Sequence, residues 1–413
     1  MEEMKKNFKK KVLDNGLTVL FEKRDLPIAS VCFAVKSGGI QEPLEEKGVS
    51  HFIEHMLYKG TKTRNNKQIA EEIEKRGGEL NGFTSEEATG YWCKMPAKHL
   101  GTALEVLGDV VRNPQFDEKE IEKERKVIFE EIKMRHDVPQ VYVFDEIQKC
   151  LYSGSLSIDL IGTYETMNSI TRKKLVESFK KIYSPENMIL TVVGDVDFNE
   201  VLKYAENMFP SDKKSEEIQE QPLELKNESR TETRAGVDQA NLVLSYHVPT
   251  AEDSEGGDYA ARVLSSLMGE GMSSRLFSEI REKRNLAYSI KGEAEINKRF
   301  AYNFVYVGTT KERVGEVKKL ILGEFKKVAE NLSEEELEQI KEQLIGNYLI
   351  SIEDSQEQMT ELLFSEVHSK AEDFYEFEKR IREVKLNDVR KLADKVVKGN
   401  YSFFALLPED KNN

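Results

Sequence analysis

Cysteine, histidine and long apolar runs are all scarce in this chain of 413 residues. The three cysteines, Cys32, Cys93 and Cys150, have neither metal-site spacing nor the pattern of a disulfide framework, so we interpret them as buried thiols in a reducing compartment. No run of 18 or more apolar residues is present, and the charged N-terminus lacks the apolar core of a secretory signal. These absences predict a cytoplasmic protein that does not enter a membrane.

An excess of basic residues is also missing. The 75 Asp and Glu outnumber the 61 Lys and Arg, and the formal net charge is −14. Because phosphate backbones are bound by basic faces, we expect no nucleic-acid partner. Hydrophobic residues make up 39% of the chain and charged residues 33%, which is typical of a soluble globular protein. The length suggests two to three domains, each with a core of its own.

Two of the six histidines lie four residues apart, in the segment His51-Phe-Ile-Glu54-His55. We predict a helix from Gly48 to Leu57, and side chains at this spacing share one face of a helix. Zinc hydrolases use two neutral imidazoles to bind the metal and a carboxylate to take a proton from the metal-bound water. The order His-x-x-Glu-His matches the inverted zincin pattern. The segment therefore predicts a zinc site, with Glu54 as its general base.

A catalytic zinc usually has three protein ligands and a water, so a third ligand must come from another element. Glu124 and Glu131, on the charged helix predicted after Asp117, are two helical turns apart and can face the His51 helix together. One could bind the metal while the other orients a ligand imidazole. Residue chemistry alone does not choose among the carboxylates of this helix, which are Glu118, Glu120, Glu122, Glu124, Glu130 and Glu131.

The order of predicted elements in the first half recurs in the second, which predicts an internal repeat. The charged, turn-rich segment 211–234 is predicted to be a linker between residues 1–210 and 235–413. We expect an α+β fold class, with two homologous α/β domains whose mainly antiparallel sheets pack against helices. The paired segments are the strands 28–35 and 240–248, the helices 48–57 and 259–267, the strands 91–95 and 299–307, and the strands 188–193 and 402–407.

The repeat is chemically asymmetric. Superposing the two halves puts Arg262, Ser265 and Ser266 where the first half has its three metal-site residues, and Gly346-Asn347 where it has Glu130-Glu131. None of these residue types in the second half forms a zinc site. We therefore expect the metal in the first domain only.

Three motifs of the first half, taken together, resemble the pitrilysin, or insulinase, family of zinc peptidases. The nearest likeness is to small bacterial processing-protease-like members, relatives of the mitochondrial processing peptidase β subunit, and it covers nearly the whole chain. It implies a zinc endopeptidase with one Zn²⁺ per chain held by His51, His55 and Glu131, and with Glu124 supporting a ligand imidazole. The motifs are His51-Phe-Ile-Glu54-His55, Gly77-Gly78-Glu-Leu-Asn81-Gly-Phe83-Thr84 and Glu120-Ile-Glu-Lys-Glu124-Arg-Lys-Val-Ile-Phe-Glu130-Glu131.

The resemblance also assigns residues to the substrate. The family's Arg and Tyr pair falls on Arg281 and Tyr288, which can donate hydrogen bonds to a substrate carbonyl or to the oxyanion formed from it. Gly82 stands where the family has alanine, a departure that we expect to affect only local strand stiffness. The segment implied to pair with an extended substrate as a sheet edge is Asn81, Gly82, Phe83 and Thr84.

A homodimer of half-clamshells is the assembly that the resemblance implies. In family members with two joined units, zinc and the Arg–Tyr pair lie in different units, and this chain has the length of one. Each site would then use Arg281 and Tyr288 of the partner subunit. Two other hypotheses remain: a non-catalytic scaffold, which should have damaged ligands, and a peptide-binding subunit whose structural zinc would be closed by four ligands, usually including Cys. The natural substrate stays open.

Overall fold

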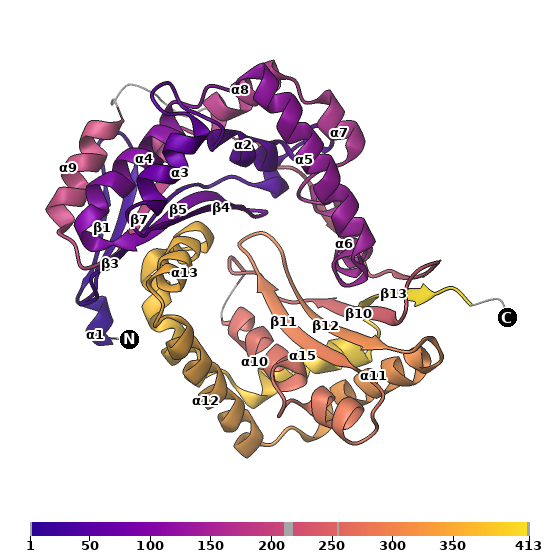
Figure 1. Ribbon diagram of the computed structural model, residues 1–413. Coiled ribbons are helices and arrows are strands. Elements are labelled where there is room, and N and C mark those ends of the chain that lie inside the picture. Colours follow the sequence, from indigo (N-terminus) through magenta and orange to yellow (C-terminus); the bar gives the residue numbers. More distant parts are fainter. Residues whose placement is uncertain (1, 210–217, 254–255, 411–413) are drawn as a thin grey trace. The chain divides into compact units, whose positions relative to one another are not determined.

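The structure, a computed structural model, describes residues 2–209, 218–253 and 256–410 and divides the chain into two compact units (Figure 1). Each unit combines segments from both halves of the sequence. The first comprises residues 1–133, 154–222 and 350–375, and the second residues 134–153, 223–349 and 376–413.

The first unit is built on a six-stranded sheet in the order β1-β2-β7-β3-β5-β4. All neighbours are antiparallel except the parallel pair β2 and β7. The central strand β3 (Ile28–Val35) is buried along almost its whole length, because helices cover both of its faces. The other strands are β1 (Phe8–Val12), β2 (Thr18–Lys23), β4 (Glu79–Thr84), β5 (Thr89–Pro96) and β7 (Met188–Gly194).

Helices of the N-terminal half cover one face of this sheet. Their apolar sides and alternate residues of the strands, such as Val31 and Phe33, form one continuous core. These helices are α2 (Val49–Leu57), α3 (Asn66–Glu74), α4 (Leu100–Arg112), α5 (Glu118–Asp137), α7 (Tyr164–Ser169), α8 (Arg172–Ile182) and α9 (Phe198–Met208), and a short α1 (Glu2–Lys5) precedes β1.

The second unit repeats this design with a five-stranded sheet in the order β11-β12-β10-β13-β9. Strand by strand it matches β4-β5-β3-β7-β2, including the one parallel pair, β13 with β9. The predicted internal repeat and the mainly antiparallel sheets are thereby confirmed. The strands are β9 (Ser229–Arg234), β10 (Ala240–His247), β11 (Ser289–Ile296), β12 (Ala301–Thr309) and β13 (Ser402–Pro408); the helices are α10 (Gly257–Gly269), α11 (Val314–Asn331), α12 (Glu334–Ser351), α14 (Phe377–Glu383) and α15 (Leu386–Val397).

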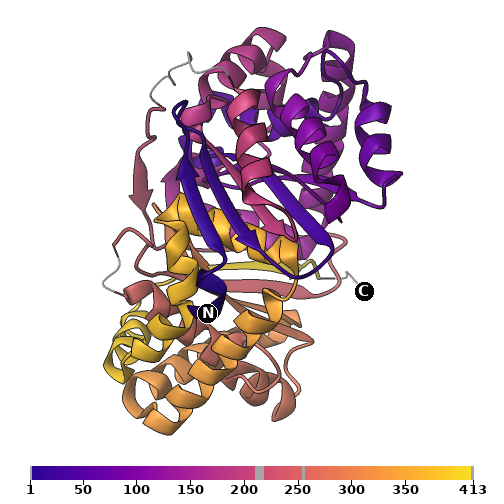
Figure 2. The same cartoon turned by 90° about the vertical axis from the view of Figure 1, so that its left-hand side faces the viewer.

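Two helices are exchanged between the halves. Helix α13 (Ser355–His368) comes from the second half but packs on β3 and β7 of the first sheet, across the face opposite α4 (Figures 1 and 2). Helix α6 (Pro139–Leu151) comes from the first half but packs on β10 and β13, the strands that repeat β3 and β7. Polar contacts fix α13, among them Ser30 Oγ to Ser355 Oγ at 2.9 Å and Lys94 Nζ to Asp354 Oδ2 at 2.6 Å.

The predicted linker needs correction. Its first part lies outside the described residues, but residues 229–234 form β9, and residues 223–225 form the short strand β8 (Leu223–Leu225), which pairs with β6 (Tyr152–Gly154). The sequence of β9 contains no apolar residue, because it is an edge strand whose side chains mostly stay exposed. Backbone pairing with β13, rather than burial, holds it in the sheet.

The three cysteines are free, buried thiols, as predicted. Among the described residues, no helix combines the length and apolar character that crossing a membrane requires.

Candidate metal centre

Helix α2 carries the two histidines and begins in a conformation that only glycine adopts easily. Its N-cap, Gly48, has a φ of 95°, and a Cβ there would lie 2.5 Å from Met167 Cε and 2.6 Å from the carbonyl oxygen of Ile161. One side of the helix packs into the core through Val49, Phe52, Ile53, Met56 and Leu57. The opposite side presents His51, Glu54 and His55, each partly buried.

The carboxylate of Glu131 lies close to both imidazoles. Glu131 Oε2, on α5, lies 3.7 Å from His51 Nε2 and 3.6 Å from His55 Nε2. Zn–N and Zn–O bonds of about 2.0–2.1 Å in tetrahedral geometry separate two ligand atoms by about 3.4 Å. One ligand atom from each of the three residues lies within 4.8 Å of the others. Within the described part of the chain this is the one group of three or more His, Cys, Asp or Glu residues that could hold a metal ion, and its donors suit zinc.

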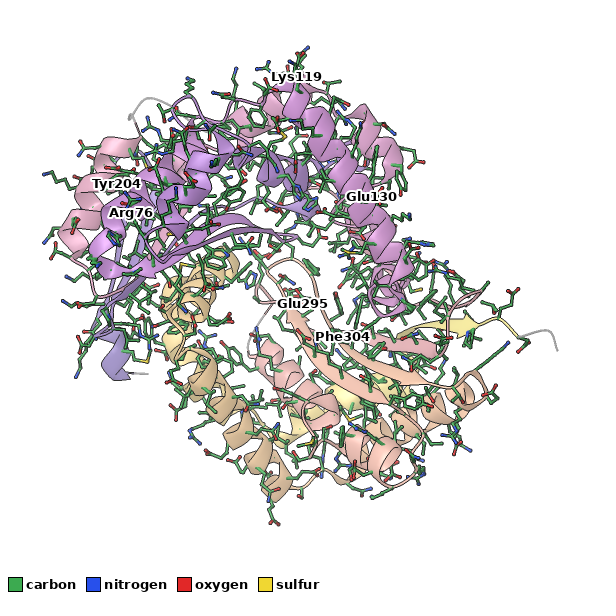
Figure 3. The ribbon with its side chains drawn as sticks, in the orientation of Figure 1. Arg76, Lys119, Glu130, Tyr204, Glu295 and Phe304 are labelled. Atoms are coloured by element: carbon green, nitrogen blue, oxygen red, sulfur yellow. The ribbon has the colours of Figure 1, made fainter. Side chains whose placement is uncertain are left out.

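The packing of α5 distinguishes among the carboxylates that the sequence left open. Glu120 and Glu122 bind neighbours on their own helix, Lys123 at 2.6 Å and Arg125 at 3.2 Å. Glu130, labelled on α5 in Figure 3, is exposed. Two members of the series reach the histidine-bearing face of α2. They are Glu131, which lies beside His51, and Glu124, seven residues earlier, which lies beside His55.

Glu124 lies behind the second imidazole. Its Oε2 is 3.1 Å from His55 Nδ1, and its Oε1 is 2.8 Å from Lys59 Nζ. Burial opposes its charge, but the hydrogen bonds with His55 and Lys59 outweigh burial and lower the pKa of Glu124 below its ordinary value. An ionised Glu124 favours a proton on His55 Nδ1, which leaves the lone pair of Nε2 available to a metal ion. Sequence reasoning missed Lys59; its position four residues after His55 was the available signal.

The site is electrostatically suited to a cation. Burial disfavours a charged His55, yet the hydrogen bond with Glu124 and the charges of Glu131 and Glu54 outweigh it and raise the pKa of this histidine. Lys59 offsets the charge of Glu124, and the other carboxylates around the two imidazoles repel one another unless further positive charge is present. A divalent ion bound by the two Nε2 atoms and Glu131 would supply that charge.

Glu54 points from α2 toward strand β4. Thr84 Oγ1 donates a hydrogen bond to Glu54 Oε2 at 3.0 Å. Burial, with a smaller contribution from Glu131, raises the pKa of Glu54 above its ordinary value, against the opposing effects of His55 and Thr84. A carboxylate whose pKa is raised toward neutrality is a better proton acceptor than an exposed one.

Strand β4 is an edge strand. It pairs with β5 on one side, while its other edge has no partner strand in the described chain. Tyr58 Oη donates to the carbonyl oxygen of Asn81 at 2.5 Å, and Phe83 packs on the opposite face against Phe364 of α13, with ring centroids 5.6 Å apart. Gly82 and Thr84 therefore face Glu54, whereas Phe83 anchors the strand to α13.

Gly82 has a larger effect than the expected change in strand stiffness. A Cβ at this position would lie 2.9 Å from Glu54 Oε1, 3.2 Å from the carbonyl oxygen of Gly90 and 3.2 Å from Tyr58 Cε2. An alanine would have to displace the Glu54 carboxylate or the strand by a few tenths of an ångström. The absence of a side chain at Gly82 therefore lets the edge strand approach the carboxylate.

Arg281 and Tyr288 belong to the second unit. Arg281 lies in a π-helical segment (Phe277–Glu282), a local irregularity frequent at functional sites, and its guanidinium carbon is 4.7 Å from the centroid of the Phe277 ring. Tyr288 is 68% exposed, and its backbone N–H donates to the carbonyl of Gly308 at 2.9 Å. Both side chains are thus on a surface rather than in a core.

Comparisons with known proteins match both halves. Residues 18–164 match the family model described as insulinase (peptidase family M16), and residues 169–344 match the one described as peptidase M16 inactive domain. A Rickettsia felis protein named an uncharacterized zinc protease is 33% identical over 85% of each chain. A Bacillus subtilis protein similarly named is 31% identical over 97% of this chain and 98% of its own. The crystal structure of a protease from Helicobacter pylori shares the fold, with a TM-score of 0.89, 23% identity and coverage of 97% and 99%.

Removing the carboxylate behind His55 should weaken metal binding. We expect Glu124→Gln to raise the dissociation constant for Zn²⁺ by about 10–100-fold, because the imidazole loses the partner that fixes its tautomer. Competition with a chromophoric chelator measures this constant. Glu130→Gln, an exposed position on the same helix, is the matched control and should bind zinc like the wild type. Wild-type affinity in Glu124→Gln would contradict the assigned role.

Proposed function

The chain belongs to peptidase family M16, the insulinase family, and we propose that it is a zinc-dependent endopeptidase acting on peptides and on flexible or unfolded protein segments. The observation that carries the proposal is the convergence of two imidazoles and Glu131, with Glu54 beside them at the edge of a sheet. The names of the relatives support zinc proteolysis as the general activity.

His51 Nε2, His55 Nε2 and Glu131 would hold the zinc ion. The ion would supply a Lewis acid that polarises the scissile carbonyl and lowers the pKa of a bound water. Glu54 accepts the proton of the attacking water on the carboxylate that Thr84 orients. It then passes this proton to the leaving amine, so that one carboxylate serves as base and as acid.

Strand β4 supports the positioning of the substrate. An extended peptide can pair with the outer edge of β4 through its main chain, which places it along the residues that face Glu54. Main-chain pairing requires an extended segment, so a folded helix or domain is a poor substrate. Such pairing recognises the substrate backbone more than its side chains, which favours broad specificity.

In the proposed mechanism, Arg281 and Tyr288 donate hydrogen bonds to the substrate carbonyl oxygen, which becomes an oxyanion. Their exposure supports this role, because side chains buried in a core are inaccessible to a substrate. We propose that the enzyme is a homodimer in which Arg281 and Tyr288 of the partner subunit complete each site. A chain of this length would then form two sites per dimer.

The alternative of a non-catalytic scaffold or peptide-binding subunit predicts a different set of residues. A degenerate site should lack a ligand or the base, yet His51, His55, Glu131 and Glu54 are all present. A structural zinc site should be closed by a fourth protein ligand, commonly Cys. Among the described residues the cluster has three donors and no cysteine, which favours an open coordination position.

Digestion of a peptide library, read by mass spectrometry, tests the proposal. We expect cleavage by the wild type that stops with a chelator and returns with Zn²⁺. Glu54→Gln should bind zinc and peptide but lose about 10²–10⁴-fold in kcat/KM, because it removes the general base. Cleavage by Glu54→Gln at the wild-type rate, or cleavage that survives the chelator, would refute the mechanism.

Gly82→Ala tests the closeness of β4 to the base. Its Cβ would lie 2.9 Å from Glu54 Oε1, so we expect a displaced carboxylate, a kcat several-fold lower and an unchanged zinc affinity. Gly101→Ala is the control, because a Cβ at Gly101 meets no atom within 4 Å. An unchanged kcat in Gly82→Ala would show that the strand or the carboxylate adapts at no catalytic cost.

Mixing two inactive variants tests the shared site. Glu54→Gln supplies an intact Arg281, and Arg281→Ala supplies an intact metal site. If sites are shared in a homodimer, random exchange of subunits should restore about a quarter of the wild-type activity, because half of the dimers carry one intact site. A site contained in one chain predicts no recovery beyond the sum of the two variants.

A further inference from the structure

The start of α2 is capped by a side chain from outside the helix. The N-cap Gly48 has no side chain to accept hydrogen bonds from the first turn. Glu42 replaces that function: its Oε2 accepts from the backbone N–H of Gly48 at 2.7 Å, and its Oε1 accepts from that of Ser50 at 2.6 Å. His51 follows Ser50 directly, so the first metal-ligand candidate lies in the turn that this carboxylate holds.

Lys47 forms the second part of the same anchor. Its side chain is fully buried, and Nζ donates to the carbonyl oxygen of Gly39 at 2.9 Å, to Glu86 Oε2 at 3.2 Å and to Ser155 Oγ at 3.2 Å. Ser155 Oγ donates to the same Gly39 oxygen at 2.6 Å. A buried ammonium with three acceptors fixes the segments that supply them.

The anchor reaches both elements that position the base. The backbone N–H groups of Gly39 and Ile40 donate to the carbonyl oxygens of Ser85 and Glu86, at 3.1 and 2.9 Å. Residues 85 and 86 directly follow β4, whose last residue, Thr84, orients Glu54. The segment 39–47 therefore ties the N-terminus of α2 to the end of β4.

The anchor buries a carboxylate beside the start of α2. Burial raises the pKa of Glu42 to about 7, although the charge of Lys47 and the hydrogen bonds from Ser50 and Gly48 oppose the shift. An N-cap side chain is excluded at this position, because a Cβ on Gly48 would lie 2.5 Å from Met167 Cε, so a carboxylate from outside the helix caps the first turn. The first turn is the part of a helix that frays most easily, and here it contains a metal-ligand candidate.

We propose that Glu42 and Lys47 are positioning residues of the metal site, which hold the first turn of α2 and the end of β4 so that His51 and Glu54 keep their orientation. The inference deepens the proposed function and rests on it for the identity of the metal. Both residues act through the backbone of α2 and β4 rather than as metal ligands.

Metal binding provides the test. We expect Glu42→Ala to bind Zn²⁺ about 10–100-fold more weakly in chelator competition, the range seen when groups that orient metal ligands are removed. The visible absorption of the Co²⁺-loaded chain should change as well, because His51 would leave its place in the coordination geometry. Glu42→Gln retains one acceptor oxygen and should fall between Glu42→Ala and the wild type. Lys47→Met should weaken zinc binding and lower kcat.

Asp258→Asn is the matched control. Asp258 is a buried carboxylate in the first turn of α10, the helix that repeats α2 in the second unit. The Asp258→Asn substitution should change the unfolding temperature but neither the zinc affinity nor the Co²⁺ spectrum. If Glu42→Ala does not fold, Glu42→Gln carries the test, because it conserves the volume and one oxygen.

The outcomes separate this inference from the proposed function. Folded Glu42 variants with the wild-type zinc affinity and Co²⁺ spectrum would overturn the positioning role, whatever the wild type hydrolyses. Weakened zinc binding in a chain that cleaves no peptide would uphold the positioning role while refuting the endopeptidase. An equal loss of zinc affinity in Asp258→Asn would show a general stability effect and would also overturn it.

Discussion

The contact of Glu131 with His51 and His55 is the constraint on which the rest of the first unit depends. Three groups that would each prefer water are held with their donor atoms at 3.6 and 3.7 Å, so two helices must be fixed in rotation as well as in distance. The apolar side of α2 sets its depth, Glu42 and Lys47 set its first turn, and Glu124 sets the second imidazole. Each of these contacts restricts a different degree of freedom of the same site.

The internal repeat shows how two units with the same fold differ, so that only the first has the candidate metal site. In the first unit, the space between α2 and the edge strand holds Glu54, and Gly82 lets the strand approach it. In the second unit, α10 and β11 close the equivalent space by backbone contact: a Cβ on Gly269 would lie 2.5 Å from the nitrogen of Gly292. Ser265 and Ser266, which repeat Glu54 and His55, are buried there. A tight helix–strand contact in one unit thus replaces the polar site of the other.

Sequence patterns predicted the parts of the site that depend on local periodicity. The spacing of His51, Glu54 and His55 predicts one helix face, and the seven-residue spacing of Glu124 and Glu131 predicts another. Choosing Glu131 over Glu130 needed the family resemblance, because only the packing of α5 on α2 distinguishes them physically. The roles of Glu42 and Lys59 went unpredicted. That of Glu42 depends on how the turn before α2 folds back on the helix, and that of Lys59 on how α5 packs beside α2. Strand β9 was missed because an exposed edge strand carries no apolar alternation.

The exchanged helices explain why the sequence domains differ from the compact units. Residues 1–210 alone would lack α13, and the sheet face bearing Ser30 would lose its cover. That face is semipolar rather than apolar, with buried Ser30, Glu22 and Thr191. Ser355 of α13 binds Ser30, and Tyr375, in the segment that follows α13, donates to Glu22. Phe83 of β4 packs on the same helix through Phe364. The strand proposed to bind substrate is therefore supported by a segment from the other half of the chain, which makes the two halves interdependent for building one site.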